Sequence, residues 1–257
     1  MKTYKLRILQ TSDVHGYVYP RSYSTNAFEN TGLGQISTLI HSLRTESTIL
    51  IDSGDTIQGS PLTYYQAKEN IGSVNPMALL MNYLKYDFIA LGNHEFNYGI
   101  EYLESYLNNI DAEVLNSNLV NTITNKPIYG DPYKIINIEN GPKIGIIGVT
   151  THYIPNWEQE LNIENITFND AFESAKKVVS MVKEIEKPDF IIINYHGGFE
   201  RDFDTFELST EDTGENQGFK MLKEIDGVDL LLTGHQHRTL AGELFGTHYL
   251  QPSFNAQ

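Results

Sequence analysis

The sequence predicts a single large α/β domain in which strands and helices alternate. Short apolar runs recur along the chain, and most of them end in a polar cluster beside a glycine, as strands do where they enter loops. Segments with the apolar spacing of helices follow several of these runs. The 257 residues and the hydrophobic content of 40% are enough for one domain with its own core, and they exclude wholesale disorder.

The first half of the chain predicts three strand-loop-helix units. Residues 6–11 alternate apolar and polar side chains, as a strand does, and the Tyr-, Ser- and Asn-rich segment 17–32 is expected to be an exposed excursion. Asn75 and Pro76 are typical of a helix N-cap and first turn. The predicted strands are 6–11, 48–51, 88–91 and 112–115, and the predicted helices are 34–43, 76–84 and a segment that begins with 100–103.

The second half predicts a hairpin followed by further strands and helices. Asn140-Gly141-Pro142 joins two apolar runs, which favours an antiparallel hairpin. A long amphipathic segment stops at Lys187-Pro188, as a helix does, and the polar, acidic segment 205–217 is expected to be a loop. The predicted strands are 133–138, 143–149, 190–195, 228–233, 239–244 and 248–250, and the predicted helices are 170–186 and 218–225.

The composition restricts the partners. The formal net charge of −15, from 33 acidic and 18 basic residues, repels nucleic acid and anionic membranes, so a polynucleotide partner is not expected. An acidic chain that acts on anionic substrates needs cations at its site. The absence of cysteine excludes disulfides, thiolate metal sites and a cysteine nucleophile.

The two ends of the sequence give expectations about location and completeness. Residues 1–10 lack the apolar segment of a signal peptide, and no apolar run approaches the roughly 20 residues of a membrane span. We therefore expect a cytoplasmic chain as given, or an exported one if a signal has been trimmed from it. The sequence stops at 254–257 just after a strand-like run, which predicts the N-terminal part of a longer protein. The oligomeric state is not predicted.

Five apolar runs end in clusters of side chains that can bind metal ions. If the strands are parallel, these clusters lie along one edge of a sheet, where ligands bind in α/β folds. Five of the eight histidines lie there, whereas His41, His152 and His248 are expected to be structural or surface residues. The clusters are Asp13-Val14-His15, Gly54-Asp55, Gly92-Asn93-His94-Glu95, His196-Gly197-Gly198 and Gly234-His235-Gln236-His237.

The clusters combine carboxylates, an amide oxygen and imidazoles without sulfur, which suits Mn, Fe, Zn or Co. Seven plausible ligands are too many for one tetrahedral ion, so a carboxylate that bridges two divalent ions, about 3.5–4 Å apart, explains the surplus. His94 is left over beside a ligand, where it could protonate a leaving oxygen or stabilise a transition state. The seven are Asp13, His15, Asp55, Asn93, His196, His235 and His237.

Each cluster alone has an ordinary structural explanation. Asp-x-His is usually a turn or a helix cap, Gly-Asp favours turns, and a single histidine before Gly-Gly is more often a loop residue than a ligand. The combination of all five clusters, each at a strand end and in this order, favours a metal site over these separate explanations.

In this order the clusters resemble the calcineurin-like metallophosphoesterase superfamily, over residues 8 to about 253. The segments 92–95 and 234–237 carry that resemblance. The segments 52–61 and 92–96 are similar to the 5′-nucleotidase group, which includes the 2′,3′-cyclic-nucleotide 2′-phosphodiesterase/3′-nucleotidase branch. Asn97 stands where 5′-nucleotidases usually have an Asp that pairs with the catalytic histidine, and this favours the cyclic-nucleotide branch slightly.

The resemblance implies a four-layer α/β/β/α sandwich with two mixed sheets, and one catalytic domain over residues 1–257. It implies His94 as the catalytic histidine, with Asn97 able to orient its ring but not to supply a charge. Glu95 is expected to fix a loop rather than to bind metal. One ion would be held by Asp13, His15, Asp55 and His237, and the second by Asp55, Asn93, His196 and His235, with Asp55 bridging.

The resemblance also implies hydrolysis of a phosphoester by attack of a metal-bound hydroxide on phosphorus. The expected substrates are nucleotides, as a 2′,3′-cyclic diester or a 3′- or 5′-monoester, which would place the chain in nucleotide catabolism. The same chemistry on a nucleotide-sugar diphosphate, or a non-catalytic metal-binding scaffold, remains open. Family members usually carry a C-terminal domain for nucleotide specificity, which we expect to be absent from this chain.

Overall fold

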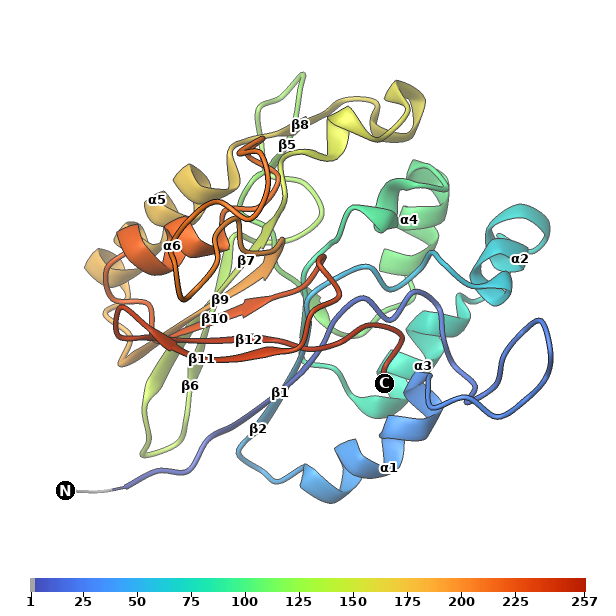
Figure 1. Cartoon of the computed structure of the whole chain (residues 1–257), viewed down its shortest axis with the longest axis horizontal. Helices are drawn as coiled ribbons and strands as arrows, with labels where there is room; N and C mark the ends of the chain where they lie inside the picture. Colours follow the sequence, from blue (N-terminus) through green and yellow to red (C-terminus); the bar gives the residue numbers. More distant parts are fainter. Residues whose placement is uncertain (1–2) are drawn as a thin grey trace.

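The computed structural model describes residues 3–257, which form two main sheets with helices on their outer sides (Figure 1). One sheet has four strands in the order β1-β2-β3-β4, and all three strand pairs are parallel. Thr11 pairs with Asp52 and Asp52 pairs with Ile89, so neighbouring strands end at the same level. The strands are β1 (Arg7–Thr11), β2 (Thr48–Asp52), β3 (Phe88–Ile89) and β4 (Glu113–Val114).

The second sheet has six strands in the order β11-β12-β10-β9-β7-β6. Its four inner strands are parallel, and each edge strand is antiparallel to its neighbour. The strands are β6 (Tyr133–Asn137), β7 (Lys143–Thr150), β9 (Phe190–His196), β10 (Leu230–Thr233), β11 (Leu240–Leu244) and β12 (Thr247–Gln251). The hairpin expected through 140–142 is therefore present as β6 and β7.

The helices cover the outer faces of the two sheets. On the side of the four-stranded sheet lie α1 (Leu33–Leu43), α2 (Pro61–Glu69), α3 (Pro76–Leu84) and α4 (Ile100–Leu107). On the side of the six-stranded sheet lie α5 (Ala171–Ile185) and α6 (Gly218–Glu224) (Figure 1). Asn75 caps α3 by accepting from the backbone N–H of Met77, as the sequence predicts.

Three layers of buried side chains separate these four layers of structure. Leu50 of β2 packs outward with α1, α3 and α4, whereas its neighbours Ile49 and Ile51 point between the two sheets. Ile192 of β9 meets them there, and Ile193 faces α5 and α6. The alternation is the period of two of a strand that is buried on both faces. The four-layer α/β/β/α architecture is thus present.

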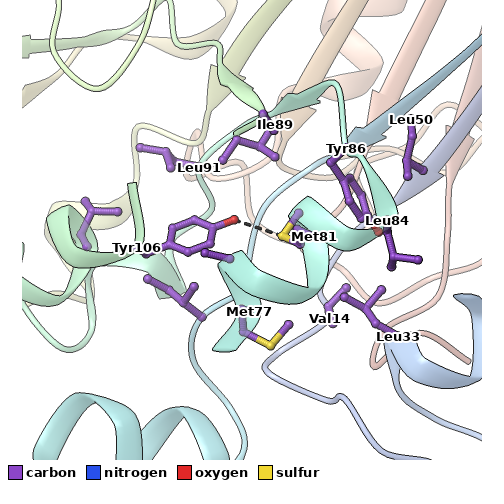
Figure 2. Close-up of a cluster of buried hydrophobic side chains, with 14 of the residues drawn as sticks. Val14, Leu33, Leu50, Met77, Met81, Leu84, Tyr86, Ile89, Leu91 and Tyr106 are labelled. Atoms are coloured by element: carbon purple, nitrogen blue, oxygen red, sulfur yellow. Dashed lines mark hydrogen bonds between the residues drawn. The ribbon is translucent and has the colours of Figure 1, made fainter. Parts of the chain in front are cut away.

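The outer core also anchors a loop at the sheet edge. Figure 2 shows Val14 beside Leu33, close to α3 with its Met77 and Met81, where the hydroxyl of Tyr106 lies 3.2 Å from Met81 Sδ. Val14 is fully buried, and burial of a valine side chain contributes about 1.5–3 kcal/mol. Because Val14 stands between Asp13 and His15, its burial fixes where these two polar side chains lie.

The structure differs from the expectations in a few elements. The four-stranded sheet is wholly parallel, so of the two sheets expected to be mixed only the six-stranded one is. Helix α2 and a small antiparallel sheet, β5 (Leu119–Asn121) with β8 (Ile166–Phe168), are additional. Three 3-10 helices are η1 (His94–Phe96), η2 (Ile154–Asn156) and η3 (Glu160–Ile163). Among the helices of residues 3–257, none combines the length and the apolar character that a membrane crossing requires.

Candidate metal centre

The seven predicted ligands all lie where strands of the two sheets end. The two sheets meet at this edge, and each of the two groups of candidate ligands takes residues from both. Asp13 and His15 follow β1, Asp55 follows β2, Asn93 follows β3, His196 ends β9, and His235 and His237 follow β10. The histidines expected to be structural or surface residues bond elsewhere: the Nδ1 atom of His41 pairs with the Ser37 carbonyl, and that of His152 with the N–H of Ala171.

One group consists of Asp13, His15 and His237. The ligand atoms of the three lie within 4.8 Å of one another, close enough to share an ion. His237 Nε2 lies 3.4 Å from Asp13 Oδ1, and His15 Nε2 lies 2.9 Å from His237 Nε2. Asp13 and His15 come from the four-stranded sheet and His237 from the six-stranded one, so this group bridges the two sheets.

A second group consists of Asp55, His196 and His235, with Asn93 beside them. His196 Nε2 lies 3.3 Å from Asp55 Oδ2 and 3.1 Å from Asn93 Oδ1. The same amide oxygen lies 2.9 Å from His235 Nδ1. Asp55 also belongs to a group with His15 and His94, and His15 belongs to the first group, so these two residues connect the two sides of the centre.

Three imidazoles are each held through one ring nitrogen, so that the other nitrogen points inward. In a neutral imidazole the nitrogen that donates to an outer carbonyl or carboxylate carries the proton, and the inner nitrogen can then bind a cation. The outward pairs are His15 Nδ1 with the Gln58 carbonyl at 3.0 Å, His196 Nδ1 with the Ser53 carbonyl at 2.7 Å, and His235 Nε2 with the Glu215 carboxylate at 2.8 Å. Three inner ring nitrogens and two carboxylates that converge fit divalent cations, whose binding would displace any proton held between them.

The electrostatics of Asp55 agree with a cation site. Burial alone would raise the pKa of its carboxyl, but the charge and hydrogen bond of His196 and the charges of His94 and His15 hold that pKa well below the usual range. In the same way Asp55 raises the pKa of His196 to about 10, against the opposing effect of burial. A protonated His196 balances the Asp55 carboxylate here, and a bound cation would take over that charge.

Five of the seven candidate ligands have a left-handed backbone conformation. Such residues cost about 1–3 kcal/mol each and persist where the surroundings enforce them, commonly at functional sites. Backbone hydrogen bonds between the loops after β1 and β2 enforce them here, from Asp13 N to the Gly54 carbonyl and from His15 N to the Asp55 carbonyl, each 2.8 Å. The φ angles are 53° at Asp13, 53° at His15, 60° at Asp55, 69° at His235 and 55° at His237.

Glu95 fixes the loops, as expected, and lies behind the ligands. Its carboxylate accepts from the backbone N–H groups of Asp55, Thr56, Ile57 and Gly92, at 2.5–3.2 Å. A carboxylate that accepts four N–H groups holds the two loops that carry Asp55 and Asn93 in one arrangement.

His94 lies at the mouth of the centre. Its Nε2 is 4.0 Å from Asp55 Oδ2, and its Nδ1 is 2.5 Å from Asn97 Oδ1. The amide of Asn97 in turn donates to Glu158 Oε2 at 2.6 Å. Sequence reasoning identified His94 and Asn97 but missed Glu158 and Glu215, because both lie in irregular segments without apolar periodicity. Their only signal is their position in the polar segments after β7 and β9.

A pocket of about 360 Å³ opens beside His94. The indole of Trp157 forms part of its wall, is 45% exposed, and has its ring centroid 5.4 Å from that of His235. The other lining residues are Asn93, His94, Asn97, Ile154, Glu158 and His235. The arrangement offers an aromatic surface directly next to the metal-binding side chains.

Known proteins resemble this chain in sequence and in fold. A 2′,3′-cyclic-nucleotide 2′-phosphodiesterase/3′-nucleotidase of Salmonella typhimurium is 34% identical over 256 residues, which are 95% of this chain and 38% of that protein. The trifunctional nucleotide phosphoesterase protein YfkN of Bacillus subtilis is 33% identical over 250 residues, 90% of this chain and 16% of that protein. This chain thus spans well under half the length of these curated relatives.

A solved structure agrees with these relatives. The structure of a Staphylococcus aureus protein provisionally assigned as a 5′-nucleotidase, in complex with α-ketoglutarate, superposes with a TM-score of 0.90 at 34% identity, over 97% of this chain and 48% of that one. The family model described as calcineurin-like phosphoesterase matches residues 6–239, which include every candidate ligand. The chain therefore belongs to the calcineurin-like phosphoesterase family.

Proposed function

We propose that this chain is a metal-dependent phosphoester hydrolase that acts on nucleotides. The observation that carries the proposal is the adjacency of the two ligand groups, which the group of His15, Asp55 and His94 connects, with one nitrogen of each imidazole directed inward. The mixed oxygen and nitrogen ligands suit two divalent ions such as Mn, Zn, Fe or Co. Asp13, His15, Asp55 and His237 would hold one ion, and Asp55, Asn93, His196 and His235 the other. When bound, such ions neutralise phosphate charge and activate a water.

His94 is the residue best placed to act on the leaving oxygen. Its Nδ1 is engaged by Asn97, so Nε2 is the atom that faces the pocket and the Asp55 carboxylate. When the ring takes up a second proton, on Nε2, it can donate that proton to the departing oxygen, a contribution of typically 10²–10⁴-fold in rate. Asn97 contributes by holding the ring in this orientation.

Nucleotides fit the surroundings of the centre. The exposed indole of Trp157 offers a flat surface for a base at the pocket wall, next to His94. The relatives from Salmonella typhimurium and Bacillus subtilis support the same substrate class. We infer 2′,3′-cyclic nucleotides as first substrates, with 3′- and 5′-monophosphates after them. Because those relatives are much longer, we also propose that a C-terminal specificity domain completes the substrate cleft in the whole protein.

Hydrolysis of 2′,3′-cAMP, 3′-AMP and 5′-AMP with added Mn²⁺ tests the proposal. The wild type is expected to release a nucleoside monophosphate from 2′,3′-cAMP and phosphate from the monophosphates, and Asp55→Ala and His94→Ala are expected to release neither. The exposed His248→Ala serves as the control, because it removes a histidine on β12 and should retain full activity. Undiminished metal-dependent activity in both site variants would overturn the assignment. A wild type that binds no metal and has no phosphatase activity with Mn, Co, Zn or Mg would point to a scaffold instead.

A further inference from the structure

Two hydrogen bonds connect His94 to a carboxylate on a distant segment of the chain. His94 Nδ1 lies 2.5 Å from Asn97 Oδ1, and Asn97 Nδ2 donates to Glu158 Oε2 at 2.6 Å across 61 positions of sequence. Glu158 directly follows Trp157 on the loop between η2 and η3, at the wall of the pocket. The loop that carries His94 and the segment after β7 are therefore coupled at this point.

The carboxylate determines the direction of both hydrogen bonds. An ionised carboxylate only accepts, so the Asn97 amide has to present its NH₂ group to Glu158. Its carbonyl oxygen then faces His94, and since an amide oxygen also only accepts, His94 Nδ1 must be the donor. Without Glu158 the amide could turn over, present its NH₂ group to His94 and favour the opposite tautomer.

Glu158 is itself held in place. Its other oxygen, Oε1, accepts from the Asn162 side-chain amide at 2.8 Å and from the backbone N–H of Gln159 at 2.8 Å. Asn162 also donates to the backbone carbonyl of Asn97 at 3.2 Å. Both carboxylate oxygens are thus occupied by protein donors, which argues for a positioning role rather than a direct contact with substrate.

From this geometry we infer that Glu158 is a positioning residue for His94, acting through Asn97. It fixes the Asn97 amide with its oxygen toward His94, so the imidazole keeps its proton on Nδ1 and turns Nε2 to the pocket. Asn97 carries no charge, so the negative charge nearest to the His94 ring in this chain of hydrogen bonds is that of Glu158, which bonds to Asn97 rather than to His94 itself. The inference rests on the proposed function of His94 for its effect on turnover, but its effect on the ring itself is independent of activity.

The tautomer of His94 is the direct readout. In ¹⁵N spectra of the metal-free chain at alkaline pH, His94 should show a protonated Nδ1 and an unprotonated Nε2. The ring ¹⁵N signals of His94 are identified as those that are missing from the spectrum of the His94→Gln variant. Glu158→Gln keeps the size of the side chain but can either donate or accept, so both ring nitrogens should move toward the average of the two tautomers. The matched control is Glu160→Gln, which removes an exposed carboxylate on the same segment.

A double-mutant cycle tests the consequence for turnover. In the wild-type background Glu158→Gln should lower kcat about five- to twentyfold with KM changed less than about threefold, a part of the 10²–10⁴-fold that a positioned acid contributes. Asn97→Asp places a carboxylate directly beside His94 and next to Glu158. In that background Glu158→Gln should raise kcat, because it replaces two facing carboxylates with a hydrogen-bonded pair.

The outcomes distinguish a failure of the role of Glu158 from a failure of the proposed phosphoesterase function. Equal losses in both backgrounds, or a His94 tautomer that is unchanged in Glu158→Gln, would overturn the role of Glu158 even in an active enzyme. Absence of phosphoesterase activity in every variant would overturn the proposed function, whereas the ring spectra would still report whether Glu158 governs His94. A rise in KM alone would assign Glu158 to substrate binding and would also overturn the inference.

Discussion

The Nε2 atoms of His15 and His237 lie 2.9 Å apart although 222 positions separate the two residues. His15 belongs to the loop after β1 and His237 to the loop after β10, so the contact joins the carboxyl edges of the two sheets. The Gln58 carbonyl holds the proton of His15 on Nδ1, which leaves a lone pair on the nitrogen that faces His237. A cation between the rings would turn this approach into a bond between the sheets.

Metal removal is therefore expected to destabilise the whole domain. An ion that binds only the folded state adds about 2.7 kcal/mol at 100 times its dissociation constant. Calorimetry should show a Tm several degrees lower in chelator than in Mn²⁺, by roughly 2–4 °C per kcal/mol for a chain of this size. The difference in Tm between Mn²⁺ and chelator should be smaller in His237→Ala and unchanged in His248→Ala. Equal Tm values with and without metal would contradict a link between the sheets.

The number of bound ions should depend on which ligand is removed. Asp55 belongs to two of the three groups of potential ligands, whereas His237 belongs to only one. Elemental analysis after dialysis is expected to find two ions in the wild type, about one in His237→Ala, and fewer than one in Asp55→Ala. If Asp55→Ala retained one ion at full occupancy, Asp55 would not be the bridging carboxylate.

Asp52 is expected to make stability fall as the pH rises. Full burial, with the nearby charge of Glu95, raises its pKa to about 7, against the hydrogen bonds from Thr11 and Thr56. Between the unfolded value of about 3.9 and the folded one, the folded state binds more protons than the unfolded state, so stability is greatest below this range and is lost through it. The full effect is of the order of 4 kcal/mol.

Asp52→Asn should lack this dependence. Urea unfolding at about pH 5 and about pH 8 gives the free energy of unfolding of the variant and of the wild type. The difference, variant minus wild type, should be larger at pH 8 than at pH 5. Comparing the two proteins at each pH cancels the contributions of the other titrating groups. A constant difference would show that Asp52 is ionised in the folded protein throughout.

Trp157 should govern the binding of the base rather than the chemical step. Stacking of a base on an aromatic side chain is worth about 1–3 kcal/mol, so Trp157→Ala should raise KM for 2′,3′-cAMP about 5- to 150-fold with little change in kcat. Trp157→Phe should restore most of the loss. Ribose 5-phosphate has no base and should be hydrolysed equally by all three proteins. Parallel losses on both substrates would assign Trp157 to the structure of the loop.

The candidate site could be predicted because parallel strands bring their ends together. Asp13, Asp55 and His196 follow apolar runs that are readable from sequence, and the register of the sheets turns these separate ends into one edge. The loop-fixing role of Glu95 is an expectation from the family resemblance rather than from the strand pattern. The metal-binding roles themselves remain a prediction that the experiments above test.

Features held by long-range or irregular contacts could not be predicted. Helix α2 has no apolar stripe, since Tyr64 and Tyr65 are exposed, and only its start is marked, by Pro61 and by the capping box of Ser60 with Thr63. Glu158 reaches Asn97 from a loop without periodicity, and nothing in the local sequence indicates its partner. The parallel pairing of β3 with β4 depends on strands of two residues, which are too short to show a pattern.

Because both sheets contribute to each ligand group, metal binding is expected to follow synthesis and folding of the domain. During synthesis Asp13, His15, Asp55 and Asn93 emerge first, but either group is completed only by residues 235 and 237, after β10. A nascent chain that ends before β10 therefore exposes separate carboxylates and the imidazoles of His15, His94 and His196, which bind divalent ions weakly until the sheets assemble. If the centre binds metal as proposed, we expect loading to follow the closure of the two sheets, so that the free ions available to the folded protein, rather than those at the ribosome, select its metal.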